Sequence, residues 1–161
     1  LPADQIPKGD RIARSSYALF NEKYSSEDEM DWHRTKRYIL AIKEMADRNG
    51  EDTIVVCIPM AHQVGSLQIQ LGKQSWGDRW KDYVEESTKP QQILRDFAMN
   101  NNMHFVDLLP AFKDLGRTQK LFLDYDGHFN ERGHEVVAVT VAEYIVANIS
   151  KLASQLNVCL D

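Results

Sequence analysis

The hydrophobic positions of this chain follow two patterns, one typical of helices and one typical of buried strands. At 25–50, residues of one face recur at steps of three and four, acidic residues crowd the start and Gly50 follows the end, which predicts a helix. The next segment, "TIVVCIP", is rich in β-branched residues, does not alternate and ends at Pro59, which predicts a short strand buried on both faces. The residues on the helix face are Trp32, Thr35, Ile39, Ile42 and Ala46.

The second half of the chain repeats this order of helix and strand. "PQQILRDFAMNNN" predicts a helix with proline in its first turn, "MHFVDLL" a second strand, and "PAFKDLG" a short helical turn. Parallel strands need a crossover connection, so the alternation predicts an α/β fold in which 53–58 is a central strand parallel to 104–108. A last helix is predicted from Asn130 onward, with its inward face formed by Val137, Val141, Ile145, Ile149, Leu152 and Leu156.

Composition limits the function classes. The 161 residues suit one domain with a core of its own, and the formal net charge of −5 comes with Lys and Arg scattered along the chain. Neither a phosphate-tracking groove nor an anionic-membrane patch is indicated, so nucleic acid is not an expected partner. No apolar run approaches the length of about 18 residues that a membrane span needs. We expect no cofactor, since no cofactor motif stands out.

The two cysteines and the N-terminal segment give two further expectations. Cys57 lies inside the apolar strand and Cys159 near the tail, without the spacing of a metal or redox motif. A disulfide between them is an open alternative, but a cysteine in a strand core is usually a small hydrophobic residue. The chain opens at Leu1 with the turn-rich "LPADQIPKGD", and 1–28 is expected to be a lead-in. From this opening we expect a piece of a longer protein.

Candidate chemistry is concentrated in "LFLDYDGHFNERGH", which precedes the last helix. Residues two apart in an extended segment project to the same side, so Asp126 can reach His128. A carboxylate on Nδ1 of an imidazole fixes the tautomer and leaves Nε2 free to take a proton from a hydroxyl nucleophile. The alternatives are that both residues only cap and pack a loop, or that they bind a metal together with His134. Asn130 is expected to cap the helix, and such a loop is expected at the carboxyl edge of the sheet.

A resemblance to a known family supports the catalytic interpretation. "DGHFNERGH", with "LFLDY" before it and a helix containing "AEYI" after it, resembles the C-terminal block of SGNH (GDSL-type) esterases and acetyltransferases. "W..T...I", "VVCIPMAHQV" and "FVDLLPAF" extend the resemblance over 29–150. It implies Asp126 as the acid that orients the base and His128 as the general base, with Gly133 and His134 as structural neighbours. It also implies a three-layer αβα sandwich with a parallel sheet, the flavodoxin-like SGNH fold.

The chain departs from the family pattern in two places. Small family members carry D-x-x-H, whereas here Asp126 stands two positions before His128 and Asp124 stands four before it. The D-x-H form is similar to that of the polysaccharide-acetylating branch, which favours Asp126 over Asp124. The family's "GDS" nucleophile, oxyanion glycine and "GxND" asparagine are not found in the 161 residues, whose Gly9-Asp10 is followed by Arg11. Six serines lack the "GDS" setting and are therefore not expected to be the nucleophile: Ser15, Ser16, Ser25, Ser26, Ser66 and Ser75.

From the resemblance we expect the C-terminal half of an SGNH-like domain, incomplete at its N-terminal half. It implies an ester hydrolase or O-acyltransferase with a Ser-His-Asp mechanism, acting on acetyl esters of a carbohydrate, to which this chain supplies the base and the acid. Alone it would be a poor catalyst, since the nucleophile and oxyanion donors are missing. Its expected partners are a second copy or the N-terminal half of the same protein. Relatives that acetylate carbohydrates work outside the cytoplasm, which would imply a periplasmic or secreted bacterial protein, although no residue here indicates a compartment.

Two alternatives from other classes stay open. The chain could be a non-catalytic carbohydrate-binding or assembly module of SGNH-like fold, with aromatic side chains stacking on sugar rings. The segment 60–89, where a short helix is expected around 64–71, supplies these aromatics, which are Trp76, Trp80 and Tyr83. It could also be an ordinary α/β domain whose loop mimics the family motif.

Overall fold

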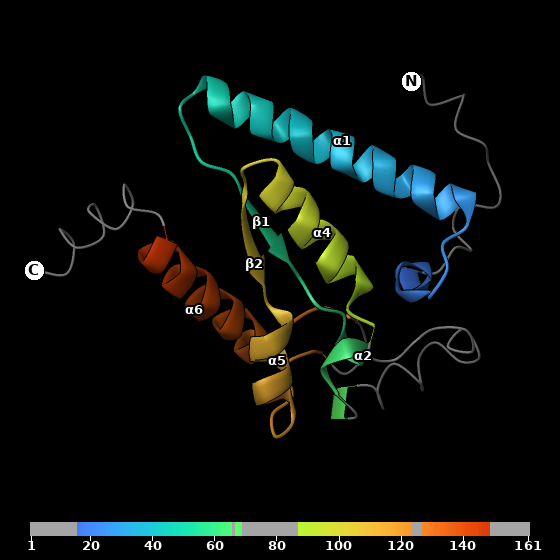
Figure 1. The fold of residues 1–161 in the computed structure, drawn as a ribbon. Coiled ribbons are helices and arrows are strands. Elements are labelled where there is room, and N and C mark those ends of the chain that lie inside the picture. Colours follow the sequence, from blue (N-terminus) through green and yellow to red (C-terminus); the bar gives the residue numbers. More distant parts are fainter. Residues whose placement is uncertain (1–15, 66, 69–86, 124–126, 149–161) are drawn as a thin grey trace, which may run out of the picture.

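The structure is a computed structural model that describes residues 16–65, 67–68, 87–123 and 127–148. Helices and strands alternate along these residues (Figure 1). A 3-10 helix at Ser16–Phe20 precedes the regular elements. These are α1 (Ser26–Arg48), β1 (Ile54–Cys57), α2 (Ala61–Val64), α4 (Lys89–Asn100), β2 (His104–Asp107), α5 (Leu109–Gly116) and α6 (Glu131–Asn148).

The two strands form a parallel sheet, as the sequence predicts. Ile54 pairs with His104 at one end and Cys57 with Asp107 at the other. α4 makes the crossover between the strands, beginning with Pro90 in its first turn and ending before Asn102, whose positive φ of 53° turns the chain into β2. The described residues therefore have an α/β fold built on a small parallel sheet.

Helices cover both faces of this sheet. On one face, His104 of β2 lies 3.2 Å from the hydroxyl of Tyr144 in α6. On the other, Arg95 of α4 bonds the Asp107 carboxylate at 2.9 Å and stacks over Phe105. Figure 1 shows the strands between α4 and α6.

The strands are less buried than the sequence predicts. Ile54, Val55 and Val56 are only half-buried, whereas Cys57 and Val106 are buried. Among the described residues the sheet has two strands, so each strand borders an edge and its side chains have neighbours on one flank only.

α1 follows its sequence signals closely at both ends. The Ser25 hydroxyl accepts from the Asp28 N–H, and the Asp28 carboxylate accepts from the Ser25 N–H, which forms a capping box. Asn49 and Gly50, the latter with φ of 70°, end the helix.

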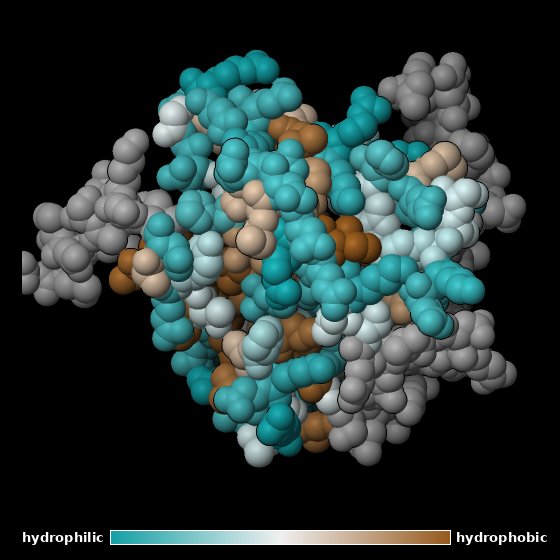
Figure 2. Space-filling model, in the orientation of Figure 1, coloured by the Kyte–Doolittle hydropathy of each residue, from teal (hydrophilic) through white to brown (hydrophobic). Residues whose placement is uncertain are grey.

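The packing of α1 is looser than its pattern predicts. No residue of the helix is fully buried; Trp32, Ile39 and Ala46 are half-buried, while Thr35 and Ile42 are exposed. The helix runs along one side of α4 (Figure 1), and the Lys36 ammonium lies 5.6 Å from the centre of the Phe97 ring of α4. Its outer side leaves Met30, Tyr38, Ile42 and Met45 exposed. Hydrophobic patches of this kind interrupt a mostly hydrophilic face in Figure 2.

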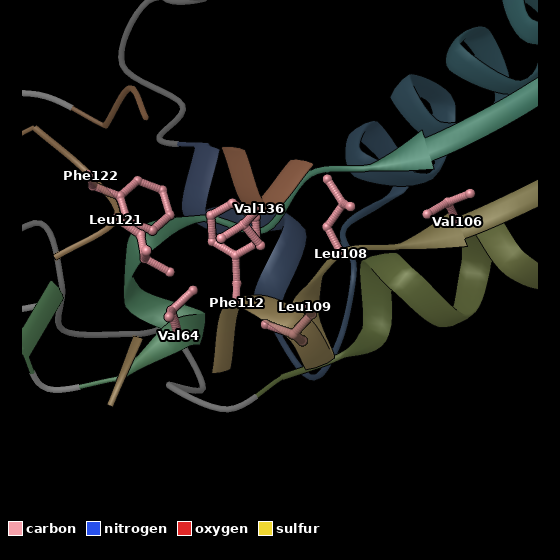
Figure 3. Close-up of a cluster of buried hydrophobic side chains, with 8 residues drawn as sticks. All are labelled: Val64, Val106, Leu108, Leu109, Phe112, Leu121, Phe122 and Val136. Carbon is pink, nitrogen blue, oxygen red and sulfur yellow. The ribbon is translucent and has the colours of Figure 1, made fainter. Parts of the chain in front are cut away.

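The core lies where the elements after the two strands meet α6. Phe112 of α5, Leu108 and Leu121 are fully buried there. Figure 3 shows the eight side chains of this cluster: Val64, Val106, Leu108, Leu109, Phe112, Leu121, Phe122 and Val136.

Two predicted helices differ in detail from the sequence analysis. α2 occupies Ala61–Val64 rather than 64–71; residues 67–68 are also helical, and 69–71 lie outside the described residues. α6 buries Gly133 and Val136 most deeply. Three of its predicted inward residues, Val137, Val141 and Ile145, are half-buried, and Ile149, Leu152 and Leu156 lie outside the described residues.

Cys57 behaves as a buried hydrophobic residue. It is 6% exposed, and burial raises the pKa of its thiol to about 11, helped by the negative charge of Asp107. Cys159 lies outside the described residues, so the disulfide alternative stays a prediction. Within the described residues, no helix is both long and apolar enough to cross a membrane.

His62 of α2 is the buried titratable group with the clearest consequence for stability. It is 2% exposed, with its ring edge-on to that of Phe20 at 4.5 Å. Burial disfavours the charged imidazolium and lowers the pKa of His62 to about 4. Between about pH 6.5 and 4, the unfolded chain therefore binds a proton at His62 that the folded chain excludes.

We expect acidification through this range to destabilise the fold. Because of His62, the free energy of unfolding at pH 4.5 should be lower by about 2–3 kcal/mol than at pH 7. His62→Leu should remove this difference. Urea denaturation at both pH values measures the difference. The exposed His33 of α1 supplies a control for the loss of a histidine, since His33→Leu leaves the buried His62 in place. Equal pH dependence in the wild type and His62→Leu would contradict the assignment.

Candidate functional site

The segment that carries His128 forms a short hairpin. The Leu123 N–H donates to the His128 carbonyl at 2.9 Å, and the Asn130 N–H donates to the Leu121 carbonyl at 3.1 Å. Between these two bonds, Phe122 and Phe129 face each other in an antiparallel bridge. Residues 121–123 and 128–130 are thus paired as the two arms of the hairpin.

This hairpin lies beside the carboxyl ends of the two strands. α2 follows β1 and α5 follows β2, so both helices start from that edge of the sheet, where the Leu108 N–H bonds the Cys57 carbonyl. Leu121 and Phe122 pack in one cluster with Val64 of α2 and Phe112 of α5 (Figure 3). In open parallel sheets, this is the edge at which functional loops gather.

An aromatic cluster fixes the inner side of the hairpin. The ring centroid of Phe129 lies 4.8 Å from that of Phe112 and 5.2 Å from that of Phe122. Phe129 packs inward against these rings and is half-buried, whereas its neighbour His128 is exposed.

The first turn of α6 packs against the base of the hairpin. Asn130 accepts a bond from the Gly133 N–H at 2.9 Å through Oδ1 and donates one to the Lys120 carbonyl at 2.9 Å through Nδ2. The predicted helix cap is therefore confirmed, and the same side chain also ties the helix to the other arm of the hairpin. A Cβ on Gly133 would overlap the Leu121 carbonyl oxygen and lie 2.9 Å from Phe129 Cβ, so only glycine fits this contact.

Of the other predicted site residues, the structure describes His134 but not Asp124 or Asp126. His134 is exposed, with its ring edge-on to Phe129 at 5.8 Å, which agrees with a packing role. Asp124 and Asp126 lie outside the described residues, so the distance from either carboxylate to His128 stays a prediction. Among the described residues, no three His, Cys, Asp or Glu side chains are grouped as a metal site would need.

The candidate serines and sugar-stacking residues are only partly described. Ser25 caps α1, Ser26 begins the same helix, and Ser16 begins the 3-10 helix. The others, Ser15, Ser66, Ser75, Trp76, Trp80 and Tyr83, lie outside the described residues.

The sequence patterns do not predict the contribution of Gln68, which is 1% exposed and bonds the backbone at the base of the hairpin. The helix expected around 64–71 ends at Val64, and Gly65 separates it from the helical residues 67–68. Gln68 therefore does not follow Val64 on one helical face, and the spacing of the two residues gives no local signal for its role.

A hollow of about 330 Å³ lies between α4 and α5 at the carboxyl end of β2. Its acidic group is Asp107, which bonds Arg95 and accepts from the Leu109 N–H at 3.0 Å. These bonds join the end of β2 to the start of α5 and to the middle of α4, so the carboxylate has a structural role there.

Comparisons with protein-family models, curated proteins and solved structures found no match to this chain.

The contact at Gly133 gives a direct test of the hairpin geometry. We expect Gly133→Ala to destabilise the fold by about 1–3 kcal/mol, because the new methyl group meets a backbone oxygen that cannot turn away. This loss should exceed the helical preference for alanine, which is about 1 kcal/mol. Chemical denaturation measures it. Gly127→Ala is the matched control, with open space around its Cβ, and equal stability of the two variants would contradict the contact.

Proposed function

We propose that this chain is the acid–base portion of an SGNH-type ester hydrolase or O-acyltransferase. The observation that carries the proposal is the exposed His128 on a hairpin pinned at the carboxyl ends of parallel strands. A base needs this combination, since its ring must reach a substrate while its backbone stays fixed. The family resemblance of "DGHFNERGH" supplies the reaction class.

The proposed chemistry assigns one role to each residue. The Asp126 carboxylate accepts the Nδ1–H of His128, so that Nε2 is the basic nitrogen. Nε2 takes the proton of a serine hydroxyl as its oxygen attacks the acyl carbon, then returns that proton to the departing alkoxide. Water, or the hydroxyl of an acceptor sugar, then attacks the acyl carbon of the acyl-enzyme and gives its proton to the same nitrogen. The bond between the acyl carbon and the serine oxygen breaks, and Nε2 returns the proton to that oxygen. The serine and oxyanion donors would come from residues other than these 161.

The fold proposed for the whole domain is a three-layer αβα sandwich with a larger parallel sheet. Coverage of the sheet by α4 on one face and α6 on the other supports it. The half-buried side chains of β1 are also consistent with a further strand beside it.

The tautomer of His128 tests the acid–base pair without any need for a nucleophile. In the 15N-labelled chain, at a pH at which imidazole is neutral, we expect the Nδ1–H form of His128. Asp126→Asn should shift the ring toward the Nε2–H form, as loss of a carboxylate partner does in a hydrolase triad. Long-range 1H–15N spectra distinguish the two forms.

Asp124→Asn is the matched control and should leave the tautomer as in the wild type. An effect of Asp124→Asn alone would assign the acid to Asp124. The absence of any effect from both substitutions would remove the catalytic proposal.

A further inference from the structure

Gln68 is bonded to one stretch of backbone through both atoms of its amide. Its Nε2 donates to the carbonyls of Gln119 at 2.7 Å and Gly116 at 3.2 Å, and its Oε1 accepts from the Leu121 N–H at 3.2 Å. These backbone groups lie between the end of α5 and the start of the hairpin. The bonds to Gly116 and Leu121 are buried, the bond to Gln119 is partly buried, and Gln68 itself is 1% exposed.

The stretch that Gln68 holds is the fixed arm of the His128 hairpin. Leu121 accepts from the Asn130 N–H, and Leu123, two residues further on, donates to the His128 carbonyl. Gly116 packs closely against Val64, which brings the end of α5 within reach of the glutamine. Among the described residues, the Asn130–Leu121 bond therefore ends at a residue that the Gln68 amide holds, and the Leu123–His128 bond lies two residues further along the same arm.

We propose that Gln68 is the positioning residue of the His128 site. Its amide fixes the course of 116–121, the hairpin pairs with that fixed arm, and the pairing points His128 outward. This role in catalysis rests on the proposed function, whereas the control of the hairpin by Gln68 rests on the hydrogen bonds alone.

The chain contains a matched control in Gln91 of α4. Its side chain is 2% exposed, and its amide forms two reciprocal bonds of 3.1 Å with the amide of Gln63. Gln63 in turn bonds the Ser87 carbonyl and the Met60 N–H. Loss of either buried glutamine thus breaks buried hydrogen bonds, but only Gln68 bonds the arm of the hairpin.

The experiment compares Gln68→Met with Gln91→Met in the full 161-residue chain. Methionine keeps the length of the side chain and removes its amide. Native-state hydrogen exchange is measured at the amides of Leu123 and Asn130, with those of His104 and Leu108 as internal references. We expect Gln68→Met to accelerate the first pair at least about tenfold more than the second, and Gln91→Met to affect both pairs alike. Equal acceleration of both pairs in Gln68→Met would overturn the proposal.

The His128 tautomer provides a second readout, which general destabilisation does not change. If the wild type has the Nδ1–H form, Gln68→Met should reduce its share while Gln91→Met preserves it, and an unchanged share in Gln68→Met would refute the positioning role. If the wild type lacks that form, the proposed function fails. The exchange result alone then decides whether Gln68 controls the hairpin.

Discussion

The backbone of Leu121 is the junction on which the candidate site depends. Its N–H donates to Gln68, and its carbonyl accepts from the Asn130 N–H and lies against the first turn of α6. Such a close approach of helix to backbone requires glycine at 133. The side chain of Leu121 is fully buried in the core, so local hydrogen bonding and tertiary packing meet in one residue.

This junction connects folding to chemistry. The aromatic contacts of Phe129 and the bonds at Leu121 fix the base of the hairpin, while His128 stays exposed on its outer side. A general base must combine a fixed backbone with an accessible ring, since a small displacement from the substrate costs much of its effect. A loop that only caps a helix needs Asn130 but gives no reason for a buried glutamine to hold the opposite arm.

Sequence patterns predict the elements well where the signals are local. The acidic start of α1, Pro90 in the first turn of α4 and the β-branched run of β1 each depend on neighbours in the chain, and each lies where expected. The sequence does not predict how deeply each face is buried, because burial depends on which elements meet. Ile42 is therefore exposed despite its place in the predicted stripe. Gln68 was missed for the same reason, since its partners lie about 50 residues away along the chain, while Asp126 and its distance to His128 lie outside the described residues.

Hydrogen exchange of the wild-type chain tests the central claim most directly. If the junction at Leu121 holds the hairpin as part of the core, the amides of Leu123 and Asn130 should be protected nearly as strongly as that of Leu108, which bonds the Cys57 carbonyl at the end of the sheet. Exchange of Leu123 and Asn130 at the rate of an unstructured peptide, with Leu108 still protected, would show that the hairpin is not held and would contradict the account.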